Sequence, residues 1–298
     1  MFSGNTVVDR LLRRLLNKAE RELQQLPQFL RQARRAGVAD SPAVRVESNA
    51  LEQALRPLLL PLVGGAARLF MRLCNSTTVR SAARRLRSSA QASPGATQVL
   101  GEERLASAVL HRAPGQGLLS VCNHVGALDD PLLFAAALPA SVLSQPEALR
   151  WTLCATDRCF VNPLTDAFFR AGKVLPVARG RGMHQPGLAA AELRLAEGQW
   201  VHIFPEGTRS QTGVIGPVRP GVGRLYAAAL EEARRRSPAA PAPLILPFVH
   251  VGMADVNPRG TALLSVGKDV RILVGQPLDL SPLVAGAAQP TRSHARPH

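Results

Sequence analysis

Short apolar runs and helical repeats alternate along most of the chain. Each run combines β-branched or aromatic residues with lengths typical of buried strands. The predicted strands are GLLSVC (117–122), KVLPV (173–177), WVHIF (200–204), PLILPFVHV (243–251), ALLSV (262–266) and VRILV (270–274). Apolar residues at helical spacing predict helices over 163–171, 186–197 and 222–236. This alternation predicts an α/β fold with a central, mostly parallel or mixed sheet flanked by helices.

The opening segment has a helical repeat of its own. Apolar residues recur every fourth position from Val7 to Ala19, and arginines with Lys18 occupy the other side. We therefore expect an N-terminal basic amphipathic helical arm. Such a helix can lie on an anionic membrane, target the chain to mitochondria or pack against the body. Acidic residues such as Asp9 argue against the targeting alternative, because transit peptides are poor in acids.

A second apolar segment, PLLLPLVGGAA (57–67), is closed by Arg68 and Arg72. A membrane-spanning helix needs roughly 20 apolar residues, so this run is too short to cross. We expect a re-entrant or interfacial hairpin that bends at Pro61 and the following glycine pair. The alternative is a buried core helix.

The composition sets the expected domain organisation. A chain of 298 residues with 46% hydrophobic residues can bury a sizeable core, but it is too polar for a multi-span membrane protein. We expect a basic extension over residues 1–50, a catalytic domain over 51–283 with an interfacial apolar segment near 57–73, and a disordered tail over 284–298. The polar stretch from Ser88 to Gly101 predicts a loop.

The formal net charge of +15 favours an anionic partner. That partner could be nucleic acid, an acidic membrane surface or a substrate that carries phosphate. Charge does not choose among the three.

The cysteines at 74, 122, 154 and 159 form no C-x-x-C pair and lie in apolar surroundings. A free cysteine in such surroundings behaves as a small buried hydrophobe. We expect inert thiols.

The first chemical candidate is VCNHVGALDDP (121–131), which begins where a predicted strand ends. On a straight helix His124 would point about 140° away from Asp129, so the two meet only if the chain turns, and Gly126 permits a turn. A carboxylate on one imidazole nitrogen fixes the tautomer and leaves the other nitrogen to accept a proton from a hydroxyl. The alternative is a structural histidine beside a solvated acidic pair.

A second candidate, FPEGTR (204–209), also follows a predicted strand. Its proline and glycine predict a turn, where Glu206 could accept hydrogen bonds from hydroxyls and Arg209 could bind phosphate. In the block GKVLPVAR (172–179), Arg179 follows another strand and could also bind phosphate, with Arg219 joining it. Surface salt bridges and solvated arginines are the alternatives.

Other chemistries lack their motifs. The chain has no G-x-S-x-G elbow, Walker loop or complete G-x-G-x-x-G pattern. His202 and Glu206 are four residues apart, but on a strand and a turn they would not share a face, and no clear third ligand accompanies them. We expect no metal and no cofactor.

Taken together, H-x-x-x-x-D at 124–129, the 172–179 block, FPEG at 204–207 and the strand around Leu246–Pro247 follow the order of the four motifs of the glycerolipid acyltransferase family. The resemblance runs over roughly residues 55–280. Within the family the chain is most similar to the phospholipid–lysophospholipid transacylases that remodel cardiolipin, through NHVGALDDP (123), RWTLCATDRCF (150) and ILPFVHVGMADVNP (245). One departure is Thr208-Arg209, which matches the lysophosphatidate acyltransferases and leaves the acyl donor open.

The resemblance implies a mechanism in which His124 is the general base and Asp129 orients it. It implies substrate contacts from Arg179, Glu206, Gly207, Thr208, Arg209 and Arg219. The expected partners are phospholipid and lysophospholipid substrates at a mitochondrial membrane surface, with no nucleic acid. The acyl donor is another phospholipid or, alternatively, acyl-CoA. A hypothesis of another class is a non-catalytic basic protein that binds membrane or nucleic acid through its charge.

Overall fold

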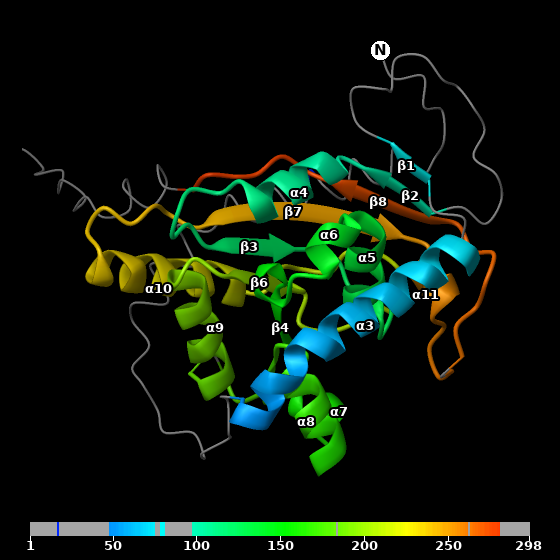
Figure 1. The fold of residues 1–298 in the computed structure, drawn as a ribbon, viewed down its shortest axis with the longest axis horizontal. Helices are drawn as coiled ribbons and strands as arrows, with labels where there is room; N and C mark the ends of the chain where they lie inside the picture. Colours follow the sequence, from blue (N-terminus) through cyan, green and yellow to red (C-terminus); the bar gives the residue numbers. More distant parts are fainter. Residues whose placement is uncertain are drawn as a thin grey trace, which may run out of the picture.

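A computed structural model of the protein describes residue 17 and residues 48–74, 78–80, 97–182, 184–261 and 263–280. The described strands form one eight-stranded sheet in the order β1-β2-β8-β7-β3-β6-β4-β5 (Figure 1). Every pair of neighbours is parallel except β7 and β8. The predicted mixed α/β sheet is confirmed. The strands are β1 (Thr78–Arg80), β2 (Thr97–Leu100), β3 (Leu118–Val121), β4 (Trp151–Ala155), β5 (Val174–Val177), β6 (Trp200–Ile203), β7 (Leu244–Val251) and β8 (Val270–Val274).

Helices connect and cover the strands. The three helices predicted from apolar spacing are confirmed as α8, α9 and α10 to within a residue at each end. Asn162 starts α8, because its side chain accepts a hydrogen bond from the Thr165 N–H in a capping box. The helices are α3 (Ala50–Cys74), α4 (Glu102–Leu110), α5 (Asp129–Ala137), α6 (Ala140–Leu143), the 3₁₀ turn η2 (Pro146–Ala148), α7 (Thr156–Cys159), α8 (Pro163–Ala171), α9 (Pro186–Ala196), α10 (Gly221–Arg236) and α11 (Met253–Val256).

The sheet buries both faces, as parallel sheets usually do. Successive residues of β3 point to opposite sides: Leu118 joins the core shared with α3, α4 and α5, while Leu119 joins the core shared with α9 and α10. Strand β3 lies between β6 and β7 and is fully buried. Its carboxyl end is therefore a rigid platform for the residues that follow it.

The apolar segment near 57–73 belongs to one continuous helix, so the expected hairpin is wrong. Helix α3 starts where Asn49 and Glu52 cap each other, and it continues through Pro57 and Pro61. Packing against α5 supports it past the prolines, and the Arg68 guanidinium donates to backbone carbonyls of the α5 region. The buried-core alternative is also wrong, because most of the described side chains of α3 are not buried; the buried ones are Glu52, Leu60, Ala67 and Met71.

The length expected for this segment is also corrected. Over Ala50–Arg72, α3 is long and apolar enough to cross a bilayer by length and composition alone. The run 57–67 is shorter than the helix because α3 continues beyond both of its ends, from Ala50 to Cys74.

Two predictions about other segments differ from the structure. Part of the expected 88–101 loop is strand β2, which pairs in parallel with β8. Residues 263–266 of the expected strand 262–266 form bends and coil, with Leu263 and Val266 exposed to 80% and 60%. A buried strand needs covered alternate side chains, which this segment lacks. The expected N-terminal arm, apart from Asn17, and the expected tail lie outside the described residues.

Candidate active site

The segment after β3 turns so that His124 meets Asp129. Residues 122–128 are not helical, and Asp129 is the first residue of α5. The His124 Nδ1 and Asp129 Oδ2 atoms lie 2.9 Å apart. A Cβ atom on Gly126 would lie 2.7 Å from Asp129 Oδ1, so this approach requires glycine. The turn expected at Gly126 is therefore present, and its reason is space for the carboxylate.

Asp129 is fully buried and holds its charge. Its Oδ2 atom also accepts hydrogen bonds from the N–H groups of Val125 (2.7 Å) and Gly126 (2.9 Å). Burial opposes ionisation, but His250, His124 and the backbone donor at Val125 hold the pKa of Asp129 below its ordinary value. An ionised carboxylate makes the His124 Nδ1 the donor, and the Nε2 atom remains to accept a proton.

The imidazole of His124 is fixed from several sides. Its ring stacks on Phe204, with centroids 3.9 Å apart and planes at 17°. Its backbone N–H donates to Glu206 Oε1 (3.1 Å), and its carbonyl accepts from the Ser210 N–H (2.7 Å). The side chain is 19% exposed, whereas that of Asp129 is 0% exposed. This difference suits a base that meets substrate and a carboxylate that does not.

Glu206 links two loops through both of its oxygens. Oε1 accepts from the His124 N–H, and Oε2 accepts from the Gly216 N–H at 2.8 Å. The side chain is buried. The structure thus gives Glu206 a positioning contact that sequence reasoning missed, while its expected contact with substrate hydroxyls stays a prediction.

The turn after Glu206 depends on Gly207 and Arg219. Gly207 has a φ of 65°, and a Cβ there would lie 2.9 Å from the Cδ of Arg219. The Nε atom of Arg219 donates to the Glu206 carbonyl at 2.8 Å. Arg219 therefore braces the turn, and Thr208 is exposed beside it.

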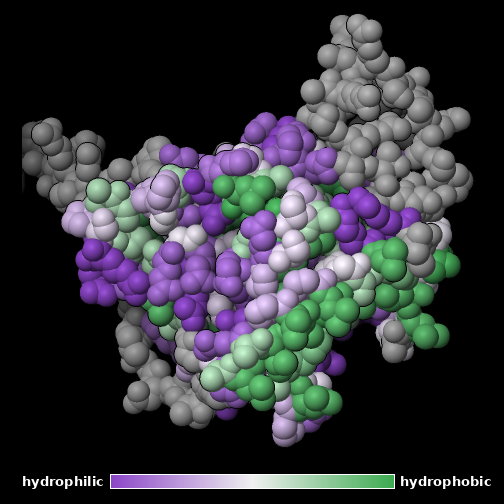
Figure 2. Space-filling view, viewed as in Figure 1, coloured by the Kyte–Doolittle hydropathy of each residue, from purple (hydrophilic) through white to green (hydrophobic). Residues whose placement is uncertain are grey.

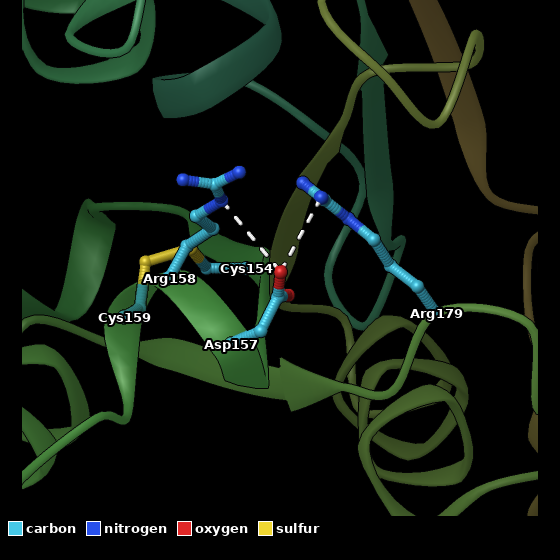
Figure 3. Close-up of a disulfide and its surroundings, with 5 residues drawn as sticks. All are labelled: Cys154, Asp157, Arg158, Cys159 and Arg179. Carbon is cyan, nitrogen blue, oxygen red and sulfur yellow. Dashed lines mark ion pairs between the residues drawn. A yellow bond between two sulfur atoms is a disulfide. The ribbon is translucent and has the colours of Figure 1, made fainter.

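Four guanidinium groups surround the outer side of this site, and we call Arg158, Arg179, Arg209 and Arg259 the arginine cluster. Asp157 forms ion pairs with Arg179 and Arg158, which Figure 3 draws as dashed lines. Its Oδ2 atom lies 3.5 Å from Arg179 and 3.6 Å from Arg158. Burial, followed by the positive charges of Arg259, Arg158 and Arg179, lowers the pKa of Arg209 despite the opposing charge of Asp129. The structure thus brings Arg179 and Arg209 toward the same region, as expected. Sequence reasoning missed Arg158 and Arg259, although Arg158 lies in the quoted stretch RWTLCATDRCF.

A disulfide joins Cys154 to Cys159 across α7 (Figure 3). The expectation of inert thiols is therefore wrong for this pair. A spacing of five residues matches no short cysteine motif, and only the end of β4 and the turn of α7 bring the two Cα atoms to 6.1 Å. Cys122 is a free and buried cysteine, and burial raises the pKa of its thiol.

His250, near the end of β7, reaches the same carboxylate from the neighbouring strand. Its Nε2 atom lies 3.6 Å from Asp129 Oδ2 and 2.8 Å from the Asn123 carbonyl oxygen. Asn123 and His250 also exchange two backbone-to-side-chain hydrogen bonds. Sequence reasoning assigned His250 no role, because its partners are 121 and 127 residues away.

The described part of the chain contains no group of three or more His, Cys, Asp or Glu side chains placed to hold a metal ion. His202, considered above for such a role, is fully buried and bonds Ser120 through Nδ1 at 2.9 Å.

Comparisons with known proteins agree on one family. A family model described as Acyltransferase matches residues 96–256. The N-acylphosphatidylethanolamine synthase of Arabidopsis thaliana is 30% identical over 250 residues, which cover 81% of this chain and 77% of that protein. Tafazzin of Drosophila melanogaster is 36% identical over 63% of this chain and 47% of its own length, and taffazin of Dictyostelium discoideum is 38% identical over 53% of each. The chain spans about half the length of these two relatives.

Among solved structures, the 1-acyl-sn-glycerophosphate (LPA) acyltransferase of Thermotoga maritima aligns over 91% of this chain and 86% of its own. The TM-score is 0.46 and the sequence identity is 15%.

Proposed function

The chain belongs to the acyltransferase family, and on that basis we propose that it is a CoA-independent transacylase that moves fatty acyl chains between phospholipids and lysophospholipids. The observation that carries the proposal is the His124–Asp129 pair, in which a buried, ionised carboxylate holds a partly exposed imidazole. Similarity to tafazzins supports a phospholipid donor. Cardiolipin remodelling is the biological role that we propose.

The proposed chemistry needs no covalent enzyme intermediate. His124 Nε2 takes the proton of a lysophospholipid hydroxyl, and the oxygen attacks the ester carbonyl of the donor. The ester C–O bond breaks, and the imidazolium returns the proton to the departing glycerol oxygen. Asp129 stabilises the imidazolium, as the carboxylate of a catalytic triad does. One ester is exchanged for another, so the equilibrium constant should lie near unity.

We propose that the arginine cluster binds the lipid phosphate. Arg158 and Arg179 form ion pairs with Asp157, and the positive charges of Arg158, Arg179 and Arg259 act on Arg209. Guanidinium groups bind phosphate oxygens in pairs, which orients the headgroup as well as attracting it.

Helix α3 fits an association with membranes. It exposes a row of leucines to between 42% and 73%, and Figure 2 shows them as a hydrophobic band along the helix. The row consists of Leu51, Leu55, Leu58, Leu62 and Leu69. Because α3 also packs against α5 and α8, we propose that it lies along the bilayer surface with the body attached. A mitochondrial membrane is the proposed location, supported by the basic repeat from Val7 to Ala19 and by the tafazzin relatives.

Two observations favour other reactions of the same site. Thr208-Arg209 resembles the lysophosphatidate acyltransferases and favours acyl-CoA as donor. The name of the Arabidopsis relative points to the amine of phosphatidylethanolamine as acceptor. Both would use the same base.

A single assay separates these reactions. Full-length protein is incubated in vesicles with phosphatidylcholine labelled in its acyl chains and with lysocardiolipin, in the absence of CoA. Parallel arms add unlabelled acyl-CoA or replace lysocardiolipin with phosphatidylethanolamine, and mass spectrometry identifies the products. We expect label in cardiolipin without CoA.

The assay is repeated with His124→Ala and with His111→Ala as its control. His111 is exposed at the end of α4 and serves as a remote histidine. We expect His124→Ala to lose about 10²–10⁴-fold in rate and His111→Ala to keep it. Transfer that requires acyl-CoA, or an N-acylated product, would replace the proposal with the corresponding alternative. Vesicle binding without any transfer by the unmodified protein would favour a non-catalytic basic protein.

A further inference from the structure

His250 shares a carboxylate with the proposed base. Strand β7 lies beside β3 in parallel register, with Val121 opposite Pro247, so His250 lies beyond the carboxyl end of β3. Its side chain is fully buried. The Asp129 Oδ2 atom 3.6 Å from its Nε2 is the same oxygen that faces His124 Nδ1 at 2.9 Å. Two imidazoles therefore share one oxygen of Asp129: that of His124, which is partly exposed, and that of His250, which is buried.

The tautomer of His250 follows from its partner. The Asn123 carbonyl oxygen can only accept, so the Nε2 atom at 2.8 Å must carry the hydrogen. The Asp129 Oδ2 atom lies 3.6 Å from the same nitrogen, beyond hydrogen-bond distance. Burial lowers the pKa of His250, although the charges of Asp129 and Glu206 oppose this shift and His124 adds to it. Burial therefore favours the neutral ring, while the neighbouring carboxylates favour the protonated ring.

The carboxylate has an uneven set of contacts. Oδ2 faces His124, two backbone N–H groups and His250, whereas Oδ1 is buried without a hydrogen-bond partner among the described residues. A rotation of the carboxylate would break the contact with His124. His250 lies 3.6 Å from the bonded oxygen and holds Asn123, the residue before His124, through three hydrogen bonds.

We propose that His250 is a positioning residue that holds the Asp129 carboxylate and the Asn123–His124 backbone in the geometry in which His124 can act as base. It acts through Asp129 and Asn123 and does not touch substrate. The kinetic part of this inference rests on the proposed function.

The test compares two substitutions at this position. His250→Gln can place an amide N–H where Nε2 lies, whereas His250→Phe keeps the ring and removes the donor. In His250→Phe the carboxylate loses its fixed orientation, so His124 loses part of the attraction that favours its protonated form. We expect kcat to fall by at least about 10-fold with little change in KM, and the acid limb of the pH profile to move down by about 0.5–1 unit. We expect His250→Gln to recover kcat to within about 3-fold.

A second readout needs no turnover. The pKa of His124 is measured by NMR with labelled imidazoles in the unmodified chain and in both variants, with His111→Gln as the remote-histidine control. His111 is exposed at the end of α4, so its loss should leave the titration of His124 unchanged. An unmoved or raised pKa of His124 in folded His250→Phe would overturn the proposal. If the unmodified chain were inactive in the transacylase assay, this titration would still decide the role of His250.

Discussion

The His124–Asp129 centre and the arginine cluster lie near each other but are held in different ways. Asp129 is fully buried, and three donors reach one of its oxygens. Arg179 and Arg158 are more than half exposed and meet Asp157 through ion pairs of 3.5 Å and 3.6 Å. Exposed ion pairs contribute little free energy, whereas an orphaned buried charge costs several kcal/mol. The centre is therefore rigid, whereas the cluster can adapt to its ligand. Substitutions in the two regions should therefore affect the reaction in different ways.

The largest expected effect is at the centre. Asp129→Asn keeps the shape of the side chain but removes the charge that orients and stabilises the His124 imidazolium. We expect kcat to fall by about 10²–10⁴-fold with KM nearly unchanged, measured in the vesicle assay. Asp255→Asn on α11, where the carboxylate is exposed, is the matched control. A fall of less than about 5-fold in a folded variant would contradict the proposed role.

The next effect concerns stability in acid. The pKa of His202 is lowered to about 4 by burial, against an ordinary value of 6.5. Between pH 6.5 and 4 this histidine binds a proton in the unfolded chain but not in the folded chain. The free energy of unfolding therefore falls as pH falls through this window, and the contribution of His202 is fully present above it. Two and a half pKa units correspond to about 3 kcal/mol in the free energy of unfolding. Urea unfolding at several pH values measures it.

The comparison of variants isolates this contribution. His202→Gln should flatten the dependence on pH, and Arg179→Gln should leave it as it is, because arginine does not titrate in this range. Identical slopes for the unmodified chain and His202→Gln would show that His202 does not carry the acid sensitivity.

A smaller effect is expected at Glu206, whose two oxygens link two loops of the site. Glu206→Gln turns one acceptor oxygen into an N–H group that faces a backbone N–H of His124 or Gly216. A lost buried acceptor costs about 1–3 kcal/mol, so we expect kcat to fall by about 10-fold. If KM rose instead while kcat held, Glu206 would bind the acceptor hydroxyl rather than position the base. Steady-state kinetics with varied lysophospholipid distinguish the two roles.

The smallest effect is expected in the arginine cluster. Arg179→Gln and Arg209→Gln should each raise KM by about 3–10-fold and leave kcat almost unchanged, because each removes one cation of several around the proposed phosphate. Added salt should weaken substrate binding by the unmodified protein, so that its KM approaches the KM of the variants. Arg235→Gln, on the exposed side of α10, is the matched control. An equal loss for all three variants would mean that charge acts on the vesicle as a whole.

Local patterns predicted much of this molecule. The apolar runs located five of the described strands, because a sheet buried on both faces needs continuous hydrophobic sequence. The spacing of His124 and Asp129, five residues apart with Gly126 between them, predicts that the two side chains meet. Their catalytic roles, the substrate contacts and the domain boundaries remain predictions.

Long-range packing explains what the sequence analysis missed. Helix α3 passes through Pro57 and Pro61 and packs on α5 and α8, and nothing within the run itself reveals those contacts. The Cys154–Cys159 bond depends on where β4 ends. His250 reaches Asp129 only because β7 pairs with β3.

The contact between α3 and α5 has a consequence for where the reaction can take place. Asp129 opens α5, and α5 rests on α3, whose far side presents leucines. The carboxylate thus belongs to a helix that packs directly on the element that we assign to lipid. Because this contact holds the proposed base at a fixed position relative to the leucines of α3, the protein should select ester bonds by their depth in the bilayer before it selects them by headgroup.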